Sequence, residues 1–140
     1  MRFWDSSAIV PLLVAEEHSA RMRHLVRRDP VLLTWWATEL ECASAIARLE
    51  RDQRLATVAA NIALARLREY REGWHEIEPV VVVRETAKRL LRVAPLRAAD
   101  ACQLAAAIVA ANHQPAALDF VCLDERLAAA AEREGFTIVR

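Results

Sequence analysis

Apolar residues occur along the chain as short compact runs that alternate with longer stretches of helical spacing. A compact run of about four apolar residues predicts a strand that is buried on both faces of a sheet. The predicted strands are residues 2–5, 31–34, 120–123 and 136–139, with 74–78 as a further short strand or an extended connection. The predicted helices are residues 8–15, 18–28, 37–53, 57–72, 97–112 and 125–134.

Residues 80–91 carry two conflicting signals. The valine-rich run 80–83 has the propensity of a strand, yet it continues directly into residues 84–91, whose composition and spacing are helical. The boundary between the two stays open at this point.

Strands that alternate with helices predict an α/β fold, namely a three-layer α/β/α sandwich with a central, mainly parallel sheet. A chain of 140 residues, 55% of them hydrophobic, has enough apolar surface for one core, and no Ser-, Gly- or Pro-rich stretch indicates a linker. We therefore expect a single domain over residues 1–140. In such folds ligands gather at the carboxyl ends of the strands.

The amino-terminal segment does not resemble a signal peptide, because a carboxylate, Asp5, comes too early, and no apolar run is long enough to span a membrane. We expect a cytoplasmic protein with no membrane partner. The three cysteines lie far apart and form no paired motif, so we expect them to be reduced and mostly buried. They are Cys42, Cys102 and Cys122.

Four carboxylates fall where the expected fold would place a site. Asp5 follows the first strand, Glu41 lies in the first turns of a helix, Asp100 lies near the start of another, and Asp124 follows a late strand. Such a cluster suits Mg²⁺ or Mn²⁺, because these hard cations prefer oxygen ligands, and such ions activate water for attack on phosphodiesters.

Asp100 is the most informative of the four, because residues 98–111 contain only two polar side chains, Asp100 and Gln103. An ionised carboxylate in apolar surroundings is costly unless a cation compensates its charge. The other positions have alternatives. Asp5 and Asp124 could be helix N-caps, Glu39 competes with Glu41, and Asp119 competes with Asp124.

Four segments together resemble the PIN-domain family, in particular the VapC-type toxins of bacterial toxin–antitoxin pairs. Each motif is loose alone, but their order and spacing over nearly the whole chain are specific. The matching segments are residues 3–10 (FWDSSAIV), 41–48 (ECASAIAR), 96–105 (LRAADACQLA) and 120–127 (FVCLDERL). The one departure is Cys122, where members of the family often carry Thr or Ser.

The resemblance implies that Asp5, Glu41, Asp100 and Asp124 form the acidic site of a PIN-like fold, binding Mg²⁺ or Mn²⁺. It further implies endonucleolytic cleavage of structured RNA such as tRNA or ribosomal RNA, a homodimer, and neutralisation by a small VapB-like antitoxin. A catalytically inactive PIN-like module that binds RNA or protein is the non-enzymatic alternative. Phosphotransfer domains are a weaker rival, because neither their second aspartate near Asp5 nor their late lysine is present.

A net charge of zero at first argues against a nucleic-acid partner. Setting aside the four proposed ligands, however, leaves 15 acidic against 19 basic residues. Three arginines at helical spacing after Glu41 are therefore candidates for binding RNA phosphates or an antitoxin carboxylate, with a solvated helix face as the alternative. They are Arg48, Arg51 and Arg54.

Overall fold

Five short strands form one sheet, and every neighbouring pair is parallel. The computed structural model describes residues 1–140, and its strand order is β3–β2–β1–β4–β5. The strands are β1 (Arg2–Trp4), β2 (Leu32–Trp35), β3 (His75–Ile77), β4 (Asp119–Val121) and β5 (Thr137–Val139). All five carboxyl ends therefore lie along the same edge of the sheet.

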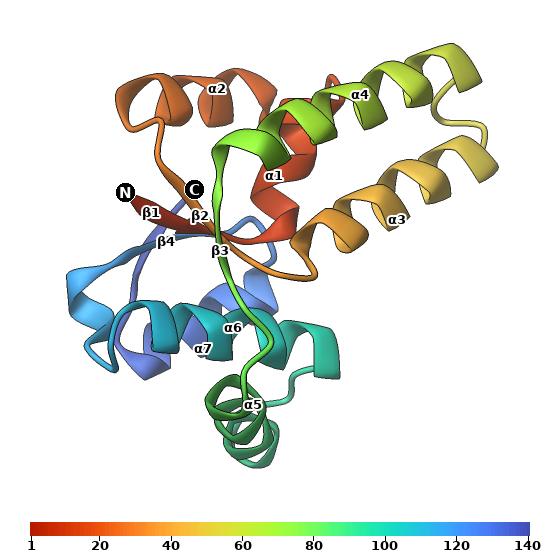
Figure 1. The fold of residues 1–140 in the computed structure, drawn as a ribbon. Coiled ribbons are helices and arrows are strands. Elements are labelled where there is room, and N and C mark those ends of the chain that lie inside the picture. Colours follow the sequence, from red (N-terminus) through yellow and green to blue (C-terminus); the bar gives the residue numbers. More distant parts are fainter.

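Seven α-helices cover the two faces of the sheet, with α1 to α4 on one face and α5 to α7 on the other (Figure 1). This arrangement confirms the expected three-layer α/β/α sandwich. The helices are α1 (Ser6–Leu13), α2 (Ser19–Arg28), α3 (Thr38–Arg51), α4 (Thr57–Gly73), α5 (Val81–Val93), α6 (Ala98–Ala110) and α7 (Glu125–Glu134). A 3-10 turn, Pro115–Ala117, precedes β4. None of these helices combines the length and the apolar character needed to cross a membrane.

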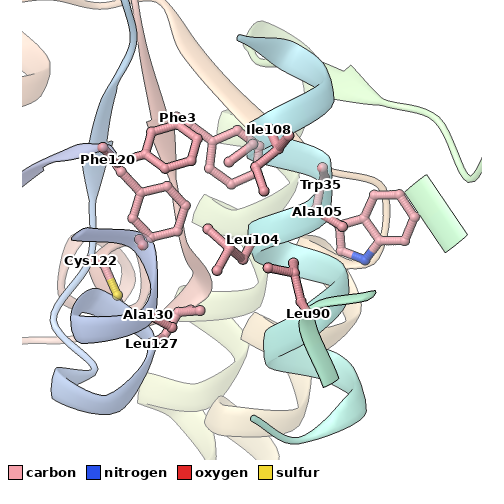
Figure 2. Packing of buried hydrophobic residues seen from close by; sticks show 14 of the residues in the cluster. Phe3, Trp35, Leu90, Leu104, Ala105, Ile108, Phe120, Cys122, Leu127 and Ala130 are labelled. Atoms are coloured by element: carbon pink, nitrogen blue, oxygen red, sulfur yellow. The ribbon is translucent and has the colours of Figure 1, made fainter. Parts of the chain in front are cut away.

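The strands supply side chains to two separate cores, because successive residues of a strand point to opposite faces. Phe3 packs in the core beneath α5, α6 and α7, where its ring stacks on Phe120 at a centroid distance of 5.4 Å (Figure 2). Trp4, its neighbour, packs in the core beneath α1 to α4. This alternation determines which side chains of β1 face each helix layer.

Helix α5 resolves the ambiguity at residues 80–91, and the strand alternative for 80–83 is wrong. Val83, Ala87 and Leu90 are buried at helical spacing along α5, whereas Val81 and Val82 are exposed. The hydrophobic stripe thus overrides the β-propensity of the valines. Helix α1 also begins earlier than predicted, at Ser6, because Asp5 caps it.

The sheet has a topological switch point between β1 and β4, because the strands that follow β1 in the chain lie on both sides of it. From β1 the chain adds β2 and β3 on one side, and later β4 and β5 on the other. A crevice opens beyond the carboxyl ends of the strands at such a switch point, and ligands bind there in open α/β sheets. Asp5 follows β1 directly, and Asp124 follows β4 by three residues.

The two glycines differ in conformation, and this difference predicts opposite effects of alanine. Gly135 ends α7 with φ +101°, so we expect Gly135→Ala to lower the free energy of unfolding by about 1–2 kcal/mol. Gly73 ends α4 with open space around an added Cβ, so Gly73→Ala should leave stability unchanged or raise it by up to about 1 kcal/mol. Urea denaturation checks both, and equal effects would contradict the special role of Gly135.

Candidate acidic site

Asp5 is the buried centre of the acidic group at the switch point. Its side chain caps α1 by accepting a hydrogen bond from the Ser7 backbone N–H at 3.0 Å, and it also accepts one from the Ser7 hydroxyl. Only 3% of the residue is exposed. Burial raises the pKa of Asp5 above its ordinary value, and the hydrogen bonds from Ser7 oppose this rise only in part.

The Ser7 hydroxyl joins Asp5 to the loop that follows β4. While it donates to Asp5, its oxygen accepts hydrogen bonds from the backbone N–H groups of Leu123 at 2.9 Å and Asp124 at 3.2 Å. The Sγ of Cys122 lies 3.7 Å from the same Asp5 oxygen. This serine thus connects the carboxyl ends of β1 and β4 across the switch point.

Glu41 approaches Asp5 from the first turn of α3. Its Oε2 accepts a hydrogen bond from Nε2 of Gln103 on α6 at 2.7 Å. Burial raises the pKa of Glu41, the bond from Gln103 lowers it, and the negative charges of Asp5 and Asp100 raise it further. Glu41 is therefore close enough to Asp5 and to Asp100 for their charges to repel it.

Asp100 lies at the edge of this group rather than in its interior. Its Oδ2 accepts a hydrogen bond from the Arg97 backbone N–H at 3.3 Å and lies 3.6 Å from the Arg126 guanidinium. The side chain is 23% exposed, because the buried part of α6 begins only at Ala101. The expectation that Asp100 sits in wholly apolar surroundings is thus wrong, and Asp5 holds the most buried charge.

Asp124 borders the group through its backbone, while its side chain caps α7. Its Oδ1 accepts a hydrogen bond from the Leu127 N–H at 2.8 Å. Asp5 and Asp124 thus both act as the helix N-caps that the sequence left open as alternatives. Both caps still lie at the switch point, because Asp5 follows β1 and Asp124 follows β4.

The competing carboxylates lie elsewhere. Asp119 is the first residue of β4, at the opposite edge of the sheet, and pairs with Arg2 at 3.1 Å. Glu39 is directed to Arg71, with a separation of 3.5 Å. The structure therefore brings Glu41 rather than Glu39, and Asp124 rather than Asp119, to the switch point.

All three cysteines are free, as expected, and Cys42 and Cys122 are buried. Burial, followed by the negative charge of Asp5, raises the pKa of both buried thiols well above the usual range. They stay neutral at physiological pH and are poor nucleophiles. The Ser7 hydroxyl is equally engaged, because its proton and both of its lone pairs are already in hydrogen bonds.

Gln103 is the site residue that sequence reasoning passed over. It is 1% exposed, and its amide bridges to Glu41 across the end of the sheet. The signal was present in the sequence, since Gln103 is the only polar residue besides Asp100 in the apolar stretch 98–111. A buried amide in such a stretch needs a polar partner, and the partner here is a carboxylate.

A divalent cation fits these residues in donor type and charge. Asp5, Glu41 and Asp100 supply hard oxygen donors whose mutual repulsion is relieved by one nearby guanidinium, that of Arg126. As they stand, no three acidic, histidine or cysteine side chains converge to hold one ion. Each carboxylate instead accepts a hydrogen bond from the protein: Asp5 from Ser7, Glu41 from Gln103 and Asp100 from Arg97.

The three arginines predicted to contact RNA or an antitoxin extend from the site along α3 and the turn after it. Arg48, Arg51 and Arg54 are exposed, and none forms an ion pair. Arg48 lies two turns beyond Glu41, about 10 Å along the helix axis. Figure 1 shows α3 and α4 projecting together away from the sheet at this end.

Comparison with known proteins adds no relative: no protein-family model matches the chain, and no curated protein matches its sequence. The interpretation of the site therefore depends on its own geometry.

The raised pKa of Asp5 predicts a pH-dependent cost in stability. Because the folded state disfavours the charged form, this cost is absent below about pH 4 and grows as the pH rises toward the folded pKa. Without added metal, Asp5→Asn should therefore raise the free energy of unfolding at pH 7 and lose this advantage near pH 4. Urea denaturation at both pH values measures it. Asp119→Asn is the control, and a similar gain in that variant would contradict the assignment.

Proposed function

We propose that the chain is a Mg²⁺- or Mn²⁺-dependent endoribonuclease of the PIN-domain type. The observation that carries this proposal is that Glu41 lies near both Asp5 and Asp100 at the switch point of the sheet, where Asp5 and Glu41 are so buried that their pKa values rise. Burying carboxylates that repel one another costs free energy, and a bound cation would offset that cost.

Asp5, Glu41 and Asp100 would hold the ion, and Asp124 would assist it or a second ion. A bound divalent cation supplies activation of water and neutralisation of charge on the phosphodiester. Arg126 lies 3.6 Å from Asp100 and balances part of its charge. The Ser7 hydroxyl keeps Asp5 beside the loop that carries Asp124.

The side chains around the cluster favour direct hydrolysis over covalent catalysis. The Ser7 hydroxyl has no free lone pair, and the thiols of Cys42 and Cys122 are buried and neutral. None of these three side chains is therefore an activated nucleophile. Hydrolysis by water is the reaction class that such a cluster supports.

The substrate and partners in this proposal come from the resemblance of the four motifs to VapC-type toxins. We infer cleavage of structured RNA, either tRNA or ribosomal RNA, by a homodimer in the cytoplasm that a small VapB-like antitoxin neutralises. The unpaired arginines on and after α3 support a polyanionic ligand, because they extend a basic surface outward from the acidic cluster.

A matched pair of glutamates tests the catalytic proposal. With Mg²⁺ or Mn²⁺, the protein should cut total RNA into discrete fragments that EDTA abolishes. Glu41→Gln should lower the cleavage rate by about 10²-fold or more, equivalent to about 2.7 kcal/mol of activation free energy, whereas Glu39→Gln should not. Refolding from denaturant beforehand removes any co-purified antitoxin. RNA binding without cleavage in any metal would favour the inactive binding module instead.

The arginines of α3 should contribute to RNA affinity through phosphate contacts. In an Asp5→Asn background that prevents cleavage, Arg48→Gln and Arg51→Gln should each weaken RNA binding and reduce the slope of log affinity against log salt by about 0.7–0.9. Arg133→Gln, in the last turn of α7, is the matched control. Filter binding over a salt series measures the slope, and an unchanged slope would mean that these arginines form only a solvated helix face.

A further inference from the structure

We propose that Gln103 is a positioning residue of the acidic site, which holds the Glu41 carboxylate in the orientation that a divalent cation requires. This inference depends on the proposed function above, because it assigns a role toward the same ion. Gln103 does not itself contact the reacting atoms in this proposal. It acts through Glu41.

The Nε2 atom of Gln103 belongs to a short hydrogen-bonded chain that runs from Glu41 to the end of β2. Its Nε2 donates to Glu41 Oε2 at 2.7 Å and lies 3.3 Å from the Thr38 Oγ1. That hydroxyl oxygen in turn accepts the backbone N–H of Trp35, the last residue of β2, at 3.2 Å. The position of the Glu41 carboxylate is thereby tied to the end of a sheet strand rather than to the flexibility of its own side chain.

Gln103 also joins the two helices that carry Glu41 and Asp100, namely α3 and α6. It lies three residues after Asp100 on α6, so the two side chains share one face of that helix. Helix α6 therefore presents a carboxylate and an amide donor together toward the start of α3. A hydrogen bond from Gln103 places Glu41 of one helix layer beside Asp100 of the other.

An ordinary core glutamine would have both ends of its amide paired. The Oε1 atom of Gln103 is buried and has no hydrogen-bond partner in the protein, although Nε2 is paired. An unpaired buried carbonyl oxygen destabilises a fold, and a leucine or methionine of similar volume would fill the same space without that cost. The contact to Glu41 is what an amide provides at this position and an apolar side chain does not.

The test is direct Mn²⁺ binding, measured by electron paramagnetic resonance on the full chain without RNA. Gln103→Met keeps the volume and removes the donor, so we expect a 10- to 100-fold rise in the Mn²⁺ dissociation constant, the usual effect of removing a group that orients a metal ligand. The urea midpoint of metal-free protein checks that the methionine variant is folded, because the substitution removes a donor to Glu41 as well as the unpaired Oε1. Gln114→Met, at an exposed glutamine, is the matched control and should change neither quantity.

A second variant separates orientation from packing. Gln103→His restores an N–H donor with a similar volume and should recover most of the Mn²⁺ affinity that methionine loses. Equal Mn²⁺ affinity in the unsubstituted and methionine proteins, or no recovery with a folded histidine variant, would overturn the role of Gln103 alone. Failure of the unsubstituted protein to bind Mn²⁺ would overturn the proposed function, and this inference with it.

Discussion

The cost of burying the Asp5 carboxylate organises the structure around it. A charge with 3% exposure must be compensated locally, and the first turn of α1 and the Ser7 hydroxyl supply hydrogen bonds for that purpose. The same hydroxyl receives two backbone N–H groups from the loop after β4. A local capping interaction thereby becomes a link between the two central strands of the sheet.

Polar contacts join the two helix layers beyond the carboxyl edge of the sheet. Elsewhere the sheet lies between the layers, with one apolar core on each of its faces. At the edge, Gln103 of α6 reaches Glu41 and Thr38 of α3. Apolar packing thus holds each helix layer on its face of the sheet. The hydrogen bond from Gln103 holds Glu41 of one layer near α6 of the other.

The alternation of compact apolar runs with amphipathic stretches was sufficient to predict the layers, since strand and helix periodicities differ clearly. It was insufficient at Val81 and Val82, where tertiary burial of one helix stripe decides the conformation. Asp5 and Asp124 were predictable at the switch point because they follow strand ends, and Glu41 and Asp100 because they lie in the first turns of helices. Their relative burial was not predictable, because the exposure of Asp100 depends on how α6 begins beside Arg97 and Arg126. The pairing of Gln103 with Glu41 needed coordinates, since 62 residues separate them.

The hydrogen bonds of Ser7 join parts of the chain that are 116 and 117 residues apart. On a ribosome, the first strand emerges long before its neighbour β4, and non-local pairs of this kind close late in folding. Until residue 124 has been synthesised and released, Asp5 lacks the loop that completes its surroundings. The acidic group therefore reaches its final arrangement only after the loop behind β4 has joined β1.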